Sequence, residues 1–264
     1  MQNTFDLINK ITDNILPFIL VLTRIGAVFF TIPPFMNNNI PGQVKALFTL
    51  AFALAIFPLS AIEMDLNALS YFDVFSKIAS EFIFGLIMAF MVTIVFTGVQ
   101  VAGRFIDLNS GFGFSNIVDP MTREEVTISS RFYFIFAVTI FFVIGGHLLL
   151  IRAIAESYNF MPMGQFSFNS QTVGIIIRSF GDIFIIAFKI AIPVMASLFL
   201  TEVALAILSR AIPQIQVFLI GFPLKISVTF IVISLTLINT VPYLQNLFED
   251  SFVNIDHILK TLRN

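Results

Sequence analysis

The sequence predicts an all-α membrane protein, and three observations support this fold class. Hydrophobic residues make up 58% of the 264 residues and charged residues only 11%, whereas a soluble domain carries about 25% charged residues. Uncharged apolar runs recur along the chain and reach 22 residues in 82–103 and 23 residues in 226–248. In lipid, each backbone N–H and C=O group has to find its partner inside the protein, which a helix achieves within one segment. We therefore expect long hydrophobic helices and no strands.

Six apolar segments are predicted to be long helices: residues 14–32, 46–62, 82–103, 132–151, 183–209 and 226–248. Because a helix rises about 1.5 Å per residue, segments of this length match a hydrocarbon core of roughly 30 Å. Charged or helix-breaking residues interrupt three of them, namely Arg24 in the first, Gly145, Gly146 and His147 in the fourth, and Lys189, Pro193 and Glu202 in the fifth.

The connections between these segments suggest how the chain is divided. Residues 159–174 are polar, lack charge and contain Pro162 and Gly164, so we expect a connector between a helical part, 1–158, and a helical hairpin, 175–240. Residues 241–264 place leucine, isoleucine and phenylalanine side chains near one helical face, which predicts an amphipathic C-terminal tail for an interface or a partner.

Composition argues against several classes of function. The net charge is -2 and no lysine or arginine run occurs, so nucleic acid is not expected as a partner. The chain has no cysteine, and His147 and His257 form no recognisable ligand pattern, so neither a metal nor a cofactor site is expected. No nucleotide-binding, metalloprotease or nucleophile-elbow motif occurs, and we expect no enzymatic activity.

The distribution of lysine and arginine residues does not define an orientation in a membrane. With an even number of spans, six of the lysine and arginine residues outside the spans fall on one side of the membrane and six on the other. Ordinary bundles instead accumulate these residues in cytoplasmic loops. Either the spans differ from the apolar segments, or the chain does not form an ordinary bundle surrounded by lipid.

Four ionisable residues lie inside or beside apolar segments: Arg24, Lys189, Glu202 and Arg210. A charge within an apolar helix is costly unless it is paired or hydrated, so each is a candidate functional residue. The alternative is that each lies at a helix end or pairs across a protein–protein contact. His147 has two interpretations as well, a proton relay or a packed, hydrogen-bonded side chain.

The segment 107–125 interrupts the apolar pattern with glycines, phenylalanines and an Asp-Pro pair. The two glycines are expected to end the preceding helix, and Asp119 with Pro120 to begin a new one. Such a loop is tolerated at membrane depth where protein buries it or where it lines a cavity. Two interpretations follow: phenylalanine side chains that close a passage, or an ordinary connection packed on neighbouring helices.

Four separated motifs, which cover most of residues 20–235, resemble the FliR family of the flagellar type III export gate. They are GRFIDLNSGFGFSNIVDP at 103–120, the Pro-rich turn within 32–58, FFVIGGHLLLIRAIAESYNFMPMG at 141–164 and LSRAIPQIQVFLIGFPLKI at 208–226. Departures are mild: Leu148 stands where a second histidine is frequent, and Gln216 where asparagine is usual. The injectisome homologue is similar throughout, and the Gly-Gly-His and Gly-Phe-Gly-Phe sequences favour the flagellar form.

The resemblance implies a core subunit of the flagellar protein export gate that needs no cofactor and catalyses no reaction. Its implied partners are FliP and FliQ in a hetero-oligomeric channel, FlhB near the entrance, FlhA nearby, membrane lipid and the unfolded flagellar proteins in transit. The implied location is the bacterial inner membrane and flagellar basal body, with the gate largely on the periplasmic side of the membrane plane. Residues 1–158 would be a FliP-like part and 175–240 a FliQ-like helical hairpin.

The site residues implied by the resemblance fall into two groups. Residues 106–122, called the plug loop below, would close the passage through Gly111, Phe112, Gly113, Phe114, Asp119 and Pro120. The subunit interface would include Glu202, Arg210, Pro213, Gln214, Phe218, Gly221, Pro223 and Lys225, with Pro213 and Pro223 breaking the hairpin helices.

A rival interpretation from another class is a stand-alone ion-coupled secondary transporter. Its ion site would be Glu202 or Lys189 at a helix broken near Pro193. Inverted repeats would support it, and no convincing internal repeat is visible. A membrane-embedded enzyme is a more distant alternative, because no pair of catalytic-type residues presents itself.

Overall fold

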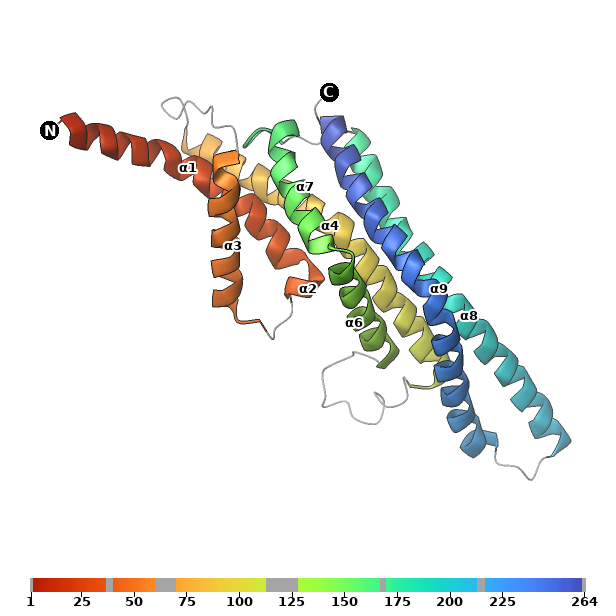
Figure 1. The fold of residues 1–264 in the computed structure, drawn as a ribbon. Helices are drawn as coiled ribbons and strands as arrows, with labels where there is room; N and C mark the ends of the chain where they lie inside the picture. Colours follow the sequence, from red (N-terminus) through yellow and green to blue (C-terminus); the bar gives the residue numbers. More distant parts are fainter. Residues whose placement is uncertain are drawn as a thin grey trace. The chain divides into compact units, whose positions relative to one another are not determined.

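The computed structural model describes residues 2–36, 40–59, 70–112, 128–166, 170–212 and 217–262. All regular structure in these ranges is helical, which confirms the predicted fold class. The helices are α1 (Gln2–Thr31), α2 (Pro33–Met36), α3 (Gly42–Ile56), the 3₁₀ turn η1 (Phe57–Leu59), α4 (Tyr71–Ser110), α6 (Ile128–Val143), α7 (Gly146–Phe160), α8 (Ser170–Ala211) and α9 (Val217–Leu262) (Figure 1).

The helices form two compact units. Unit 1 comprises Met1–Thr93, Gly145–Arg178 and Asp250–Asn264, and unit 2 comprises Ile94–Ile144 and Ser179–Glu249. The long helices α4, α8 and α9 each contribute to both units, so the boundaries fall inside helices. The predicted connector, 159–174, lies within unit 1, and its residues from 170 onward already belong to α8. The division into a FliP-like and a FliQ-like part stays a prediction.

Unit 1 is built where the Pro-rich turn reverses the chain, so that α3 returns along α1 (Figure 1). Aromatic side chains join these two helices. The ring of Phe29 stacks on Phe52 at 5.1 Å between centroids and meets Phe35 of α2 at 5.2 Å. Toward the other end, Phe18 meets Phe57 edge to face at 5.5 Å. Leu20, Val21, Ile25 and Val28 of α1 are fully buried, as is Ile32 between α1 and α2.

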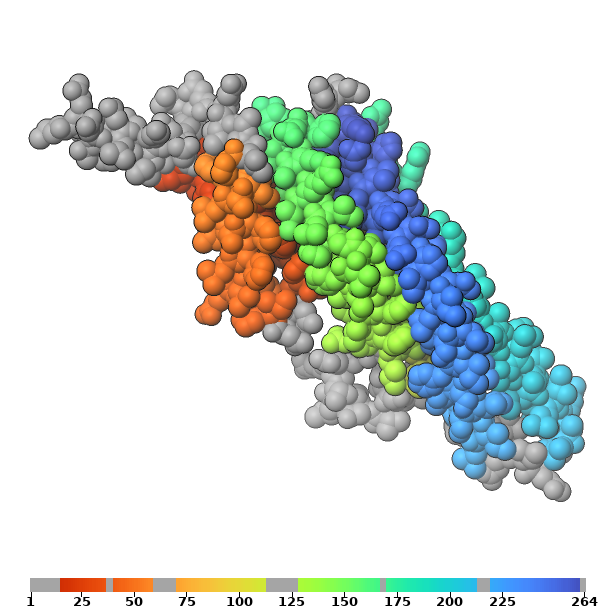
Figure 2. Space-filling view, viewed as in Figure 1, coloured from red at the N-terminus to blue at the C-terminus, as the bar shows by residue number. Residues whose placement is uncertain are grey.

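Unit 2 has an aromatic core made by residues far apart in the sequence. Phe96 of α4, Phe141 of α6 and Phe248 of α9 are fully buried, and their ring centroids lie 5.0–5.6 Å apart. Residues 179–211 of α8 and 217–249 of α9 run antiparallel and lie against one another (Figure 2). A Cβ atom on Gly98 would lie 2.8 Å from Ile186, so α4 and α8 approach closely at this glycine.

Fewer helices are long enough to span a membrane than the six that the sequence predicted. Within the described residues, three helices are long and apolar enough to cross a membrane, in Tyr71–Ser110, Ser170–Ala211 and Leu219–Thr261. The helices α6 and α7, taken together as one interrupted span, make a fourth. The first two predicted segments correspond to the shorter apolar helices Ile15–Thr31 and Gly42–Ile56.

Glycine and proline act differently as helix breakers in this chain. The break predicted at the Gly-Gly-His sequence is confirmed: α6 ends at Val143, and Gly145 has a φ of +72° before α7 begins. Pro193 and Pro242 lie inside α8 and α9, so neither helix is broken there. The expectation that Pro223 breaks a helix is wrong, because Pro223 lies inside α9. A proline removes one backbone hydrogen bond, and long apolar helices tolerate this loss when neighbouring groups satisfy the freed carbonyl.

Candidate functional site

The structure describes the start of the plug loop as far as Phe112. Helix α4 ends at Ser110, and Gly111 follows with a φ of +91°, which confirms that this glycine ends the helix. Phe112 is half-buried, and its ring lies 5.9 Å from the ring of Phe230 in α9, edge to face. The other predicted plug residues, Gly113, Phe114, Asp119 and Pro120, lie outside the described residues.

The same glycine is held against α9. A Cβ atom on Gly111 would lie 2.8 Å from the ring of Phe222, so a larger residue would have to displace that ring. Gly111 is therefore required for two reasons, its positive φ and its close contact with an aromatic ring. Gly111 and Phe112, the first two residues after α4, thus pack against α9 rather than projecting away from it.

Asp107 is a site residue that sequence reasoning missed. Its side chain is fully buried, and its two carboxylate oxygens accept hydrogen bonds from the backbone N–H groups of Ser129, at 3.0 and 3.1 Å, and Ser130, at 3.2 Å. These two N–H groups belong to the first turn of α6, which has no intrahelical acceptors for them. Asp107 therefore caps α6 from α4, a role that an N-cap residue normally performs within its own helix.

Gly103 allows this cap to form. It lies one turn before Asp107 on α4, and a Cβ atom there would come within 2.3 Å of the Cα atom of Ser130. The two helices consequently touch backbone to backbone, which brings the Asp107 carboxylate within reach of the α6 amides. Gly103 and Asp107 were both visible in the 103–120 motif, and their spacing of four residues places them on one helical face.

The tip of the α8–α9 hairpin brings three of the predicted interface residues together. Lys225 donates a hydrogen bond to Glu202, and Gly221 packs close to Leu205. These residues, with Ala206, Ser209 and Phe222, line an open surface cavity of about 400 Å³. Their grouping follows from the antiparallel hairpin, in which positions equally far from the turn lie opposite each other.

The remaining predicted interface residues are dispersed or lie outside the described part. Arg210 is exposed near the end of α8, and no described residue forms an ion pair with it. Pro223 is exposed on α9. Pro213, Gln214 and the side chain of Phe218 lie outside the described residues.

Arg24 is the one fully buried residue among the four predicted ionisable candidates. Its Nε and Nη2 atoms donate to the two carboxylate oxygens of Glu81, at 2.5 and 3.0 Å. Its Nη1 atom donates to the hydroxyl of Ser157 at 2.8 Å, and Nη2 also donates to the carbonyl of Met161 at 3.2 Å. The backbone N–H of Gly164 donates to Glu81 at 2.7 Å, so all of these partners lie in unit 1.

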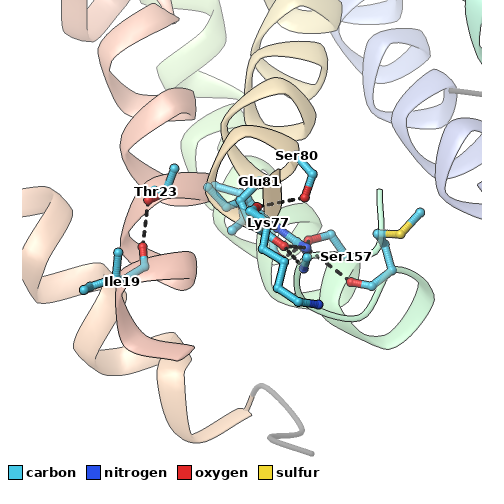
Figure 3. A network of polar contacts seen from close by, with 10 residues as sticks. Ile19, Thr23, Lys77, Ser80, Glu81 and Ser157 are labelled. Atoms are coloured by element: carbon cyan, nitrogen blue, oxygen red, sulfur yellow. Dashed lines mark hydrogen bonds and ion pairs between the residues drawn. The ribbon is translucent and has the colours of Figure 1, made fainter. Parts of the chain in front are cut away.

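Aromatic rings complete the environment of the guanidinium group. Its central carbon lies 4.7 Å from the centroid of Phe84 and 4.1 Å from that of Tyr158, within the range of cation–π attraction. Figure 3 shows Glu81 and Ser157, the two side-chain partners of Arg24, within this network. Sequence reasoning identified Arg24 but missed Glu81, whose only signal was a carboxylate at the edge of the 82–103 apolar run.

The other predicted ionisable residues are not buried. Lys189 is exposed, with its Nζ atom 5.5 Å from the ring centroid of Tyr243, and half of the Glu202 side chain is exposed. His147 is half-buried at the start of α7. In the described ranges, no group of three or more His, Asp or Glu side chains is placed to hold a metal ion.

Comparison with known proteins finds relatives that match nearly the whole chain. Residues 15–251 match the family described as bacterial export proteins, family 1. The chain is 33% identical over 255 residues to the flagellar biosynthetic protein FliR of Bacillus subtilis, covering 95% of this chain and 97% of that protein. It is 27% identical over 241 residues to FliR of Escherichia coli, covering 91% of this chain and 92% of that protein. It is 28% identical over 218 residues to Yop proteins translocation protein T of Yersinia pestis, covering 80% of this chain and 82% of that protein. The chain therefore belongs to the FliR family of bacterial export proteins.

Proposed function

We propose that this chain is a core subunit of the flagellar type III protein export gate and acts as a structural channel component without catalysis. The observation that carries the proposal is its similarity to flagellar FliR proteins over almost the full length of both chains. The corresponding subunit of a virulence injectisome is the second candidate, supported by the similarity to the Yop translocation protein T. That similarity covers 80% of the chain against 95% for the Bacillus subtilis protein, so the flagellar role is favoured.

The proposed partners are FliP and FliQ in a hetero-oligomeric gate, with FlhB and FlhA nearby and unfolded flagellar proteins as cargo. Exposed apolar side chains on the α8–α9 hairpin support a surface that is covered by partner subunits or by membrane lipid, since large apolar patches are rarely left exposed to water. Examples are Phe199, Leu200 and Ile207 on α8 and Leu235 and Ile238 on α9, each at least 64% exposed. The proposed location is the inner membrane and flagellar basal body, largely on the periplasmic side of the membrane plane.

The plug loop is proposed to close the channel until cargo passes. Phenylalanine side chains can seal a water-filled passage by excluding water from it. Support comes from the start of the loop, where Gly111 and Phe112 are held against Phe222 and Phe230 of α9. A closure element needs such a defined origin, because a loop without fixed contacts would occupy many positions.

The experiment that tests the function is native mass spectrometry of the complex that this chain forms. A C-terminally tagged chain is extracted from native membranes in mild detergent, and the intact mass and subunit identities are determined. We expect a hetero-assembly with one copy of this chain and several copies of FliP- and FliQ-like proteins. A monomer or simple homo-oligomer would contradict the proposal and return attention to the transporter, although α8 is not broken at Pro193 as that alternative requires.

A further inference from the structure

We propose that unit 1 binds one anionic phospholipid, with an acyl chain in an apolar cavity beside α3 and the phosphate group on Lys45. The cavity has a volume of about 310 Å³, and small-molecule sites usually have volumes of roughly 300–1,000 Å³. The residues that line it come from α1, α2, α3 and the turn between them, and they are Phe29, Phe35, Ile40, Val44, Lys45 and Phe48. All of them belong to unit 1, so the site does not depend on the proposed role in protein export.

The walls of the cavity are held in place by packing inside unit 1. Phe29 is 6% exposed, and its ring lies 5.1 Å from that of Phe52 and 5.2 Å from that of Phe35, between centroids. The ring of Phe52 in turn lies 6.1 Å from that of Phe48. Among the described lining residues, only Lys45 carries a polar side chain. A preformed cavity lined by apolar side chains holds water poorly and accepts apolar ligands, and a hydrocarbon chain is one such ligand.

The charge beside the cavity determines which headgroup fits. Lys45 is half-buried in the first turn of α3, and no described residue forms an ion pair with it. The sequence has no acidic residue from 14 to 62, and its only other charged residue there, Arg24, is buried and paired with Glu81. A phosphate group on Lys45 would therefore supply the missing negative charge, and it would lie near the positive end of the α3 dipole. The ammonium of a zwitterionic headgroup would meet no carboxylate from this segment.

The outer surface of α3 favours lipid over a protein partner. After Lys45, each exposed side chain of this helix is apolar, and the largest, Leu47, Phe48 and Leu54, are 56–66% exposed. Figure 2 shows α3, in orange, with its viewer-facing side uncovered by the other described helices. Protein–protein interfaces carry about one hydrogen bond per 100–200 Å², and these side chains offer no group for one. Hydrocarbon chains require none, while Gln43 and Lys45 in the first turn can reach the headgroups.

The first experiment measures lipid binding to the full chain, purified in the assembly that it forms in native membranes. Native mass spectrometry counts the phospholipids retained after phosphatidylglycerol, or phosphatidylcholine with the same acyl chains, is added to the delipidated sample. We expect phosphatidylglycerol to be retained in preference. Lys45→Gln should reduce this preference about fivefold, the contribution of one lysine near an anionic lipid surface. The control is Lys260→Gln, whose lysine pairs with Asp256 on its own helix, and it should leave the preference unchanged.

Two variants of α3 distinguish the cavity from the apolar surface around it. Val44→Phe adds bulk inside the cavity and should lower the retention of both lipids, because it removes space for the acyl chain. Val44 is 39% exposed, so we expect the larger side chain to leave the fold intact. Leu47→Phe is the matched control, since it adds a ring at a 66% exposed position of the same helix that is not one of the lining residues. That control should retain both lipids as the unmodified chain does.

A photoreactive phosphatidylglycerol with a diazirine in its acyl chain locates the bound lipid. Peptides that contain Phe29 or Phe48 should carry the label, and unlabelled phosphatidylglycerol should compete with it. Glycerol phosphate, which offers the charged group alone, should not compete. Competition by glycerol phosphate would overturn the lipid assignment and indicate a site for a soluble phosphate compound.

Other outcomes would also overturn the proposal. Equal retention of the two lipids, or an unchanged preference in Lys45→Gln, would show that Lys45 does not bind the headgroup. Unchanged retention in Val44→Phe would place the lipid outside the cavity. If p-benzoylphenylalanine in place of Phe48 cross-links to another protein subunit and not to lipid, a partner side chain occupies the cavity instead. The same measurements apply if the chain is recovered without export-gate partners, so failure of the proposed function would leave this test valid.

Discussion

The guanidinium group of Arg24 and the carboxylate of Glu81 form a bidentate ion pair that is almost completely shielded from solvent, at 0% and 1% side-chain exposure. Gly85 permits this pair, because a Cβ atom there would lie 2.5 Å from the carbonyl oxygen of Arg24. The pair also explains two features of the 141–164 motif. The Ser157-Tyr158 pair supplies a hydroxyl and a ring to Arg24, and the turn ending at Gly164 supplies an N–H to Glu81.

Removing one member of the Arg24–Glu81 pair should strongly destabilise unit 1. Glu81→Gln leaves a buried guanidinium without its counter-charge, and breaking a buried pair in this way costs about 3–5 kcal/mol. The midpoint of thermal unfolding of the purified complex should fall accordingly. An Arg24→Met, Glu81→Met double variant should lose less stability than either single change. A loss in the double variant equal to the sum of the two single losses would show that the charges are not coupled.

Adding a methyl group at Gly103 should disrupt the junction of α4 and α6. Gly103→Ala places a Cβ atom 2.3 Å from the Ser130 Cα atom, so backbone has to move. Overpacking of this kind costs about 1–3 kcal/mol, and the loss should appear as a lower unfolding midpoint. Gly174→Ala is the matched control, because no atom lies within 4 Å of a Cβ there. That change should be neutral or slightly stabilising, and similar losses in both variants would argue against the close contact.

Truncating the plug side chains should open the channel without preventing assembly. Phe112→Ala with Phe114→Ala removes the proposed seal, as does deletion of residues 110–116. Membrane conductance of cells that contain the assembled gate should rise, whereas the mass of the purified complex should change only by the altered residues. Unchanged conductance would be evidence that these phenylalanine side chains do not close the passage.

Arg210 should contribute to assembly rather than to the stability of this chain. It is exposed and forms no ion pair with a described residue, so its charge is available to a partner. Arg210→Ala should reduce the amount of FliQ-like protein that copurifies. The control is Arg152→Ala, an exposed arginine that pairs with Glu156 on its own helix and should leave recovery unchanged. Normal recovery of the full complex with Arg210→Ala would show that Arg210 does not contribute to assembly.

The Glu202–Lys225 pair should matter more to assembly than to folding. Half of the Glu202 side chain is exposed, and exposed pairs stabilise a protein by only about 0–1 kcal/mol. Glu202→Gln should therefore leave the abundance of the chain unchanged while lowering the recovery of its partners. If recovery and abundance both stay at normal levels, the pair is a local contact of the hairpin and not part of an interface.

Sequence reasoning succeeded where a local rule decides the outcome. The all-α class follows from long apolar runs, and Gly111 and Gly145 end helices with φ values of +91° and +72°. It failed at Pro223, because a proline in a long apolar helix is a weaker breaker than a glycine free to adopt a positive φ. It predicted Arg24 but not its partner Glu81. The two residues lie 57 positions apart in the sequence, and nothing in the sequence around one indicates that it pairs with the other.

The sequence by itself determined the class of fold, the order of the helices and the family to which the chain belongs, because these depend on apolar periodicity, glycine placement and motif order. The tertiary structure alone decided which polar residues meet. Asp107 reaches the backbone N–H groups of α6 only because α4 and α6 come into contact at Gly103. The role of a buried carboxylate depends on backbone donors that are far away in the sequence. These groups come close to one another only when the helices have packed.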